Sequence, residues 1–357
     1  MGSFWKYFGT ASVLSILVLA SAFLLGGIAT AAVVLILGIL EVSLSVDNAV
    51  VNAVKLNTLS PAAQRWFLYY GILIAVFGMR LIIPAVIVSL TGGLTFTETF
   101  HLALDNPKQY GVILEQAHPI LAAFGGSFLL MIFSNFFIDN EKDNHWISFL
   151  EIPLTKLAFW EGVKIILVAL VIVFFDIKLY GNMSSSTSIH FWVAGLIGVA
   201  SYIGVELLGK FVEHFENDEE TATVDVRKSG SLGSVSLKMA IPALLYLEVL
   251  DASMSFDGVM GAFALSSDIF VIMAGLGIGA FWVRSLTLVA VEKGTLAEFR
   301  YLENGAFWAI GVLSIMLFIS TISPLPDWFV GLISAAIIGA SVLSSIRANR
   351  LEAQASV

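Results

Sequence analysis

The sequence predicts an all-α polytopic membrane protein with about ten transmembrane helices, arranged as two inverted-topology repeats of five. Hydrophobic residues make up 58% and charged residues 13% of the 357 positions, against roughly 45–50% and 25% in soluble domains. Apolar stretches long enough to cross a bilayer follow one another along the chain. A charged motif of eight residues occurs twice inside such stretches, once in each half.

Ten apolar segments approach the ~20 residues that a helix needs to cross the hydrocarbon core. They cover residues 8–26, 28–54, 67–90, 119–138, 158–177, 189–211, 238–264, 268–291, 305–322 and 327–346. With this count both termini lie on one side, together with nearly all lysines and arginines of the connections. Only Lys108 and Lys178 fall on the other side. The positive-inside rule therefore predicts cytoplasmic termini, and we expect a bacterial cytoplasmic (inner) membrane protein.

The apolar N-terminus could be mistaken for a signal peptide. Its run over residues 4–25 lacks a clear cleavage site and leads directly into the next apolar segment. We therefore interpret it as a retained first span. The boundary between the first two spans is placed at Gly26-Gly27.

The repeated motif is called the first octet (residues 41–48, EVSLSVDN) and the second octet (residues 251–258, DASMSFDG). Both have an acid at the first position, serine at the third and fifth, and aspartate at the seventh. A carboxylate at bilayer depth costs ~2.5–3.5 kcal/mol even on the insertion scales. Two such residues in one span, repeated in a second span, indicate a binding function.

The octets fall in the second and seventh predicted spans, which are five spans apart and therefore run in opposite directions. The chain is thus predicted to consist of a first repeat, 1–180, and a second repeat, 181–357, within one membrane domain. Arg80 in the third span and Arg284 in the eighth are further equivalent positions. Inverted repeats place substrate sites near the midplane, often on interrupted helices.

A straight helix cannot direct all octet side chains at one ion, because residues follow one another at 100°. In the first octet-bearing helix one face carries Glu41, Ser45, Asn48 and Asn52. A second face, about 120° away, carries Ser43 and Asp47. In the other helix one face carries Glu248, Asp251 and Ser255, with Asp257 roughly opposite. Either the helix breaks within Ser-x-Ser-x-Asp or the acids serve two sites.

The donor atoms indicate a hard cation. There is no cysteine, so oxygen ligands remain, and these suit Mn²⁺, Ca²⁺ or Mg²⁺. The candidate metal ligands are Asp47, Asp257, Asn48, Glu41, Asp251, Ser45 and Ser255. Candidates for supporting them or carrying protons are Glu248, Ser43, Ser253, Arg80, Arg284 and Asn52. We expect each intramembrane arginine to pair with an acid when the site is empty; structural ion pairing or snorkelling is the alternative.

At the octets the chain resembles the TerC family of integral membrane proteins, which is named for tellurium resistance and includes manganese exporters. Its first signature, Glu-x-x-Leu-Ser-x-Asp-Asn, is matched by Glu41, Leu44, Ser45, Asp47 and Asn48. Its second, Asp-x-x-Phe-(Ala/Ser)-x-Asp-Ser, is matched by Asp251, Ser255 and Asp257, with Met254 for Phe and Gly258 for Ser. The resemblance covers about 28–138 and 238–322. It implies efflux of a divalent cation, most often Mn²⁺, in a divergent, longer subfamily.

These observations predict a secondary transporter that exports a divalent cation, Mn²⁺ first, with the bilayer and the ion as its partners. Exchange for protons is expected, because carboxylates that release metal can take up protons. The chain has no nucleotide-binding motif of the Gly-x-x-x-x-Gly-Lys-Ser/Thr type. We expect no enzymatic activity, no organic cofactor and no nucleic-acid partner, and the oligomeric state stays open.

Three alternatives remain. Two membrane aspartates that share a proton are also found in intramembrane aspartyl proteases, but the Gly-x-Gly-Asp pattern is absent. An exporter of an organic solute would bind a carboxylate or an amine in place of a metal. A non-transporting membrane partner, or a protein of tellurite or metal stress resistance, would depend on its loops and not on the octets.

Two connecting segments carry many charges. The outer segment, 91–118, contains acids and two histidines, and the inner one, 212–237, is acidic over residues 213–225. We expect solvated linkers, since charge runs are usually solvated. The alternative is a segment that collects metal ions weakly.

Overall fold

The computed structural model describes residues 2–57, 59–179, 185–220, 232–266, 268–292, 299–323 and 325–355. Within these residues the chain is helical and contains no strand, which confirms the predicted all-α class. The helices are α1 (Gly2–Leu44), α2 (Val46–Leu56), α3 (Pro61–Trp66), η1 (Phe67–Gly71), η2 (Ile74–Ile82), α4 (Ile83–Gly92), α5 (Phe96–Asp105), α6 (Pro107–Gln116), α7 (His118–Phe137), α8 (Ser148–Thr155), α9 (Gly162–Leu179), α10 (Ser185–Glu220), α11 (Leu232–Leu265), α12 (Ile269–Glu292), α14 (Leu302–Ser320) and α15 (Asp327–Ala355).

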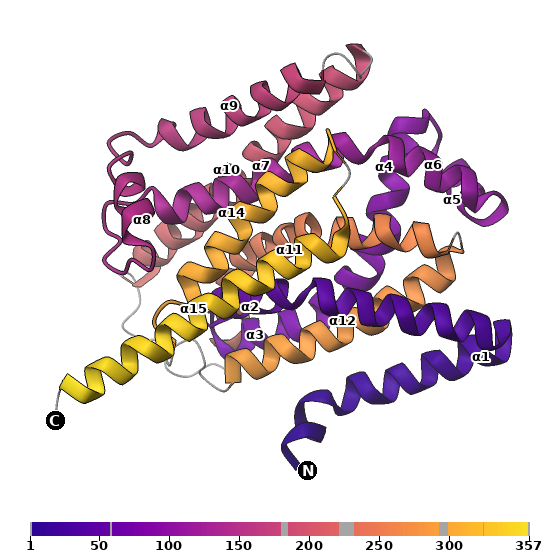
Figure 1. Ribbon diagram of the computed structural model, residues 1–357, viewed down its shortest axis with the longest axis horizontal. Helices are drawn as coiled ribbons and strands as arrows, with labels where there is room; N and C mark the ends of the chain where they lie inside the picture. Colours follow the sequence, from indigo (N-terminus) through magenta and orange to yellow (C-terminus); the bar gives the residue numbers. More distant parts are fainter. Residues whose placement is uncertain are drawn as a thin grey trace.

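Seven helices of the described part are long and apolar enough to cross a membrane. These stretches are Phe4–Leu44, Ile74–Gly92, His118–Phe137, Ser188–Phe211, Ile269–Glu292, Leu302–Ser320 and Phe329–Leu351. Figure 1 shows the long helices running roughly side by side. The chain is therefore a polytopic helical protein, whereas the count of ten spans and the inverted repeat stay predictions.

The first of these stretches is a hairpin. Helix α1 contains one residue outside the helical region, Gly27, at φ 75° and ψ −171°. A side chain rarely adopts a positive φ, so glycine suits this position. Figure 1 shows the chain turning back there, and the two limbs of α1 agree with the predicted boundary at Gly26-Gly27.

The second limb of α1 packs tightly along α12. Gly275 and Gly279 of α12 are four residues apart and face Leu37 and Glu41 of α1. A methyl group at either glycine would overlap these side chains. Small residues at this spacing let two helices approach closely in a membrane. The contact brings α12, with Arg284, against the helix that carries the first octet.

The charged connections are largely helical where the structure describes them. The outer segment forms two helices, α5 and α6. A capping box starts α5, because the Thr95 hydroxyl accepts from the Glu98 amide while the Glu98 carboxylate accepts from the Thr95 amide at 2.8 Å. On the inner side α10 continues to Glu220 and α11 begins at Leu232. The first part of the predicted acidic loop is therefore helical, and residues 221–231 lie outside the described part.

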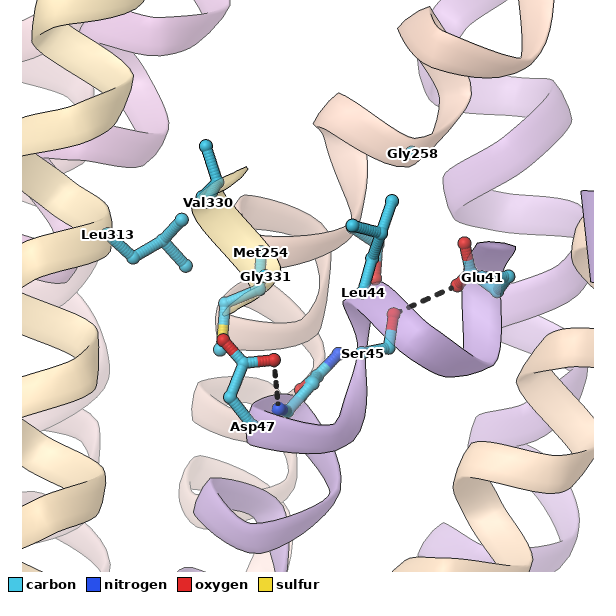
Figure 2. Close-up of a pocket in the computed structure, with 11 residues that line it drawn as sticks. Glu41, Leu44, Ser45, Asp47, Met254, Gly258, Leu313, Val330 and Gly331 are labelled. Atoms are coloured by element: carbon cyan, nitrogen blue, oxygen red, sulfur yellow. Dashed lines mark hydrogen bonds between the residues drawn. The ribbon is translucent and has the colours of Figure 1, made fainter. Parts of the chain in front are cut away.

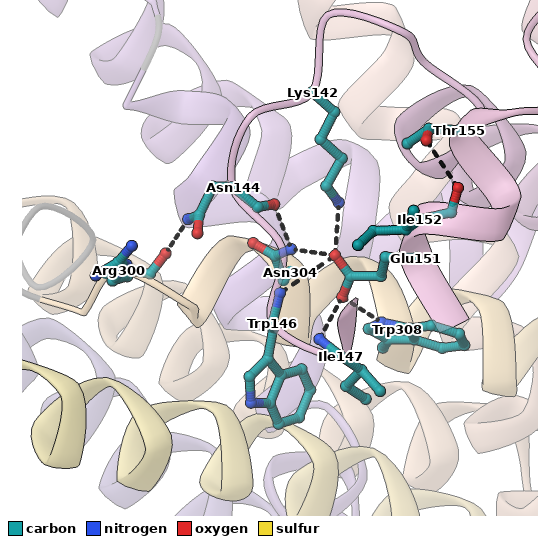
Figure 3. A network of polar contacts seen from close by, with 10 residues as sticks. All are labelled: Lys142, Asn144, Trp146, Ile147, Glu151, Ile152, Thr155, Arg300, Asn304 and Trp308. Atoms are coloured by element: carbon teal, nitrogen blue, oxygen red, sulfur yellow. Dashed lines mark hydrogen bonds and ion pairs between the residues drawn. The ribbon is translucent and has the colours of Figure 1, made fainter. Parts of the chain in front are cut away.

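A buried carboxylate fixes the connection between α7 and α9. Glu151 of α8 is fully buried, and Figure 3 shows the donors around it. Its Oε1 accepts from the Ile147 amide and the Trp308 indole, both at 3.0 Å. Its Oε2 accepts from the Trp146 amide at 3.2 Å and the Asn304 amide at 2.9 Å. Because Asn304 and Trp308 belong to α14, this network fastens the connection to the bundle.

The network makes the stability of the protein depend on pH. Burial raises the pKa of Glu151, but the hydrogen bonds from Ile147 and Trp308, together with Lys142, outweigh it and hold the pKa below its ordinary value of 4.5. A lowered pKa stabilises the fold above the unfolded-state pKa, and this contribution is lost as the pH falls through the folded-state value. We therefore expect the wild type to lose its advantage in thermal midpoint over Glu151→Gln as the pH drops below about 4.5. An undiminished difference at pH 3.5 would contradict this.

Candidate ion site

The first octet lines a small cavity between α1, α2, α11, α14 and α15. This Asp47 cavity has a volume of about 30 Å³, enough for a water or a single ion at ≳10–15 Å³ each. Figure 2 shows Asp47 and Leu313 on one side of it and Glu41 on the other. Its remaining wall consists of Leu44, Ser45, Asn48, Met254, Ser255, Gly258, Val330 and Gly331. Both octets contribute, with Leu44 and Met254, Ser45 and Ser255, and Asn48 and Gly258 as pairs of equivalent positions.

A second cavity, of about 20 Å³, adjoins the first and is called the Asp251 cavity. Its wall consists of Glu41, Asn48, Asn52, Ala75, Arg80, Asp251, Ser255, Ala280, Val283, Arg284 and Thr287. Glu41, Asn48 and Ser255 line both cavities. The equivalent acids Glu41 and Asp251, and the equivalent arginines Arg80 and Arg284, meet around it.

The helix of the first octet breaks at Ser45, as one of the two alternatives predicts. Ser45 has φ −107° and ψ 19° and separates α1 from α2. The Asn48 amide then donates to the Asp47 carboxylate at 2.8 Å, so a side chain replaces a backbone acceptor. The break brings Asp47 to the same cavity as Glu41. The same prediction is wrong for the second octet, because α11 runs through it without interruption.

Glu41 is neutralised inside the bundle. Its carboxylate forms an ion pair with Arg80 of η2, and both side chains are only 2% exposed. The Ser45 hydroxyl donates to the same Glu41 oxygen at 3.3 Å, and Arg80 also donates to the Ala75 carbonyl. The predicted pairing of Arg80 with an acid is confirmed.

Asp251 is held by two amides and by no cation within ion-pair distance among the described residues. Asn48 donates to its Oδ1 at 2.7 Å, and Asn52 donates to the same atom at 3.5 Å. Asn52 also donates to the Asn48 side chain at 3.0 Å. The predicted face of Glu41, Ser45, Asn48 and Asn52 thus connects the acid of one octet with the acid of the other.

The expected pairing of Arg284 with an acid is not seen. Its guanidinium lies 3.9 Å from the centre of the Phe67 ring, and no ion pair joins it to an acid in the described part of the chain. Glu248 is buried, and neither of its oxygens has a hydrogen-bond partner there. Glu248 lies against Gly71, where a Cβ would be 2.6 Å from its Oε1 and 3.3 Å from Arg284 Nη2. Arg284 therefore makes a contact with an aromatic ring where an ion pair was expected.

Two predicted residues, Ser43 and Ser253, line neither cavity among the described residues. Ser43 is exposed and donates to the Ile39 carbonyl of its own helix at 2.8 Å. Ser253 donates to the Val249 carbonyl at 2.8 Å, and its backbone faces Gly125 of α7 and not the cavities. The side chain of Asp257 lies outside the described part of the chain.

The sequence reasoning missed the walls from the C-terminal helices. Leu313, Val330 and Gly331 line the Asp47 cavity, and Ser334 of α15 is fully buried beside the Asp47 carboxylate. Thr287 lines the Asp251 cavity. Apolar and hydroxyl residues are common in membrane helices, so nothing in the sequence marked these positions as part of a site.

Comparison with protein families identifies the chain. The profile of the family described as "Protein of unknown function (DUF475)" matches residues 46–352, which include the whole second octet and the last three residues of the first. The chain belongs to the DUF475 family. The resemblance to the TerC family is therefore corrected, because the family that matches is DUF475 and its description names no function.

One curated relative supports the membrane assignment of this DUF475 protein. The "Uncharacterized membrane protein YceF" of Bacillus subtilis (strain 168) is 26% identical over 132 residues, which are 36% of this chain and 48% of that protein. The chain thus matches about half of the relative's length. No solved structure matches the chain. Together with the apolar helices, the relative identifies an integral membrane protein.

The geometry defines what the site of this DUF475 member can do chemically. Among the described residues no three acids or histidines converge on one point. Two buried carboxylates and one amide oxygen nevertheless border the Asp47 cavity, with the Ser45 and Ser255 hydroxyls. Such oxygens are ligands for a hard cation. Arg80 already forms an ion pair with Glu41, so a cation that binds to this carboxylate competes with an internal positive charge.

Proposed function

We propose that this DUF475 protein is a secondary transporter that exports a divalent cation, with Mn²⁺ as the first candidate, through the Asp47 and Asp251 cavities. The proposal rests on one observation: acids of both octets border two adjoining small cavities inside an apolar bundle. Buried ionisable residues in membrane helices mark ion pathways by default. Volumes of about 30 and 20 Å³ favour a single ion over an organic solute.

In the proposed mechanism, groups of the protein itself interact with the carboxylates whenever no cation is bound. In the empty site Arg80 balances Glu41, while amide donors hold Asp251. A cation that enters from the cytoplasm takes oxygens of Asp47, Asn48 and Glu41 and displaces the guanidinium. After release to the outside the carboxylates take up protons or the arginine again, which couples export to proton exchange.

Total cell manganese after a Mn²⁺ load tests this proposal. Cells without their own exporters would express wild type, Asp47→Asn, Asp257→Asn or Ser43→Ala at matched levels, with calcium, magnesium and zinc measured in the same samples. We expect the wild type to lower manganese and the aspartate variants to lose at least about tenfold in export rate, since supporting groups alone change metal affinity 10–100-fold. Ser43→Ala is the matched control, because this octet residue is exposed and bonds only its own helix.

Each outcome has a defined meaning. The cell content of another metal could fall in place of manganese, with the aspartate variants failing to lower it. In that case the proposed site stands and the transported ion is a different one. If no metal changes in any variant, the transport proposal is overturned and a non-transporting partner gains weight. Equal loss in Ser43→Ala and Asp47→Asn would show that the octet acts through folding and not through ion binding.

A further inference from the structure

A larger cavity lies away from the octets, at the end of the bundle where α7 meets the connection to α8. This pocket, called the Lys142 pocket, has a volume of about 360 Å³, within the ~300–1,000 Å³ of small-molecule sites. Phe136 and Phe307 form one wall and stack at 3.8 Å between ring centres. Two lysines, Lys55 and Lys142, reach it from α2 and from the connection. A cavity of this size and polarity has room for an organic ligand with a charged group.

The acidic neighbour of Lys142 is already saturated with hydrogen bonds from other groups. Lys142 Nζ lies 3.4 Å from Glu151 Oε2, as Figure 3 shows. A carboxylate offers about four lone-pair sites. Glu151 fills them with two backbone amides, the Trp308 indole and the Asn304 amide. The lysine is thus left beside a carboxylate whose acceptor positions are already taken.

Lys142 has the Glu151 carboxylate as its ion-pair partner but shares it with four hydrogen-bond donors. Its side chain is 8% exposed, and its ammonium has no hydrogen-bond partner within the described residues. The ammonium lies 3.8 Å from the centre of the Phe136 ring and 3.9 Å from that of Phe137. Burial lowers the pKa of Lys142 despite Glu151 nearby. A buried ammonium with spare donors that lines a cavity can donate to an acceptor that enters from outside the chain.

We propose that the Lys142 pocket binds a phosphate group carried on a small organic body. Lys142 and Lys55 provide charge, and Asn135, Tyr202 and Tyr246 provide further polar groups around the cavity. Asn135 already accepts from Lys164 at 2.9 Å through its oxygen, which leaves its amide hydrogens for the ligand. The carboxylate of Asp139 opposes binding, but it accepts from the Glu141 amide at 2.9 Å. The aromatic wall takes the apolar part of the ligand.

The phosphate group has two sources, a soluble phosphomonoester and a phospholipid headgroup. The pocket is linked to the octets, because α2 carries both Lys55 and Asn52 and α11 carries both Tyr246 and Asp251. A ligand here rests against the helices that build the Asp251 cavity. The inference does not depend on transport and stands whether or not the chain moves ions.

Thermal unfolding of the purified full chain in nanodiscs, in a buffer without phosphate, tests this inference. Glycerol 3-phosphate and inorganic phosphate would be titrated against chloride at equal ionic strength, in phosphatidylcholine and in phosphatidylglycerol discs. We expect a saturable rise of the thermal midpoint in wild type that disappears in Lys142→Met. Lys156→Met is the control, since Lys156 belongs to the same connection but is exposed. Lys142→Arg, which keeps the charge, is expected to retain at least part of the rise.

The two sources give different results. A rise with glycerol 3-phosphate in both disc types indicates a soluble ligand. A rise in phosphatidylcholine discs only, with Lys142-dependent retention of phosphatidylglycerol in native mass spectrometry, indicates a headgroup. The proposal is overturned if neither phosphate nor anionic lipid acts on the wild type. It is equally overturned if Lys142→Met, folded by near-UV circular dichroism, responds like the wild type.

Discussion

Replacing Arg80 with methionine is expected to destabilise the protein by about 3–5 kcal/mol, because it leaves the Glu41 charge buried and unpaired. Both side chains are 2% exposed, so water cannot take over from the guanidinium. The free energy of unfolding in detergent micelles, from near-UV circular dichroism during denaturant titration, measures this loss.

The double variant Glu41→Met/Arg80→Met is the matched control. Replacing a whole buried ion pair with apolar side chains is often neutral or stabilising, so we expect it to recover most of the loss. An Arg80→Met variant as stable as the wild type would show that Glu41 is protonated or solvated in the empty protein. If the double variant stayed as unstable as the single one, the guanidinium would stabilise the bundle through Ala75 and not through Glu41.

The second large effect is expected at the contact between α1 and α12. A methyl group in Gly279→Ala would overlap Cβ and Cγ of Glu41, and overpacking of this kind typically costs about 1–3 kcal/mol. The clash also displaces Glu41 from Arg80, so we expect both the unfolding free energy and metal export to fall. Gly277→Ala is the control on the same helix, because its new methyl group would meet only Val76, at 3.6 Å. Equal stabilities of the two variants would contradict the close approach.

The sequence predicted the parts of the site that depend on local geometry. Helical spacing placed Glu41, Ser45, Asn48 and Asn52 on one face, and these residues line the cavities. Serine and aspartate compete with helical hydrogen bonds, and the predicted break occurs at Ser45. The equivalent segment of α11 stays helical although its local preferences are similar. Local preference therefore predicted where a break can occur, but not in which copy it occurs.

Contacts between distant segments were not predictable in the same way. The partner of Arg284 is the Phe67 ring, and an apolar aromatic residue in a predicted span carries no sign of such a role. Glu151 was not singled out from the sequence, because its donors come from its own connection and from α14, more than 150 residues away. Four backbone and side-chain donors meet one acid only once the bundle is folded.

The wall shared by the two cavities would limit how many ions the proposed transporter can hold at once. Glu41, Asn48 and Ser255 border both spaces, so an occupant of one cavity uses ligands that the other also needs. Repulsion between two divalent ions at such close range adds to this competition. A saturation experiment on the proposed transporter should therefore give a stoichiometry of one high-affinity ion per chain. Further binding should require far higher metal concentrations.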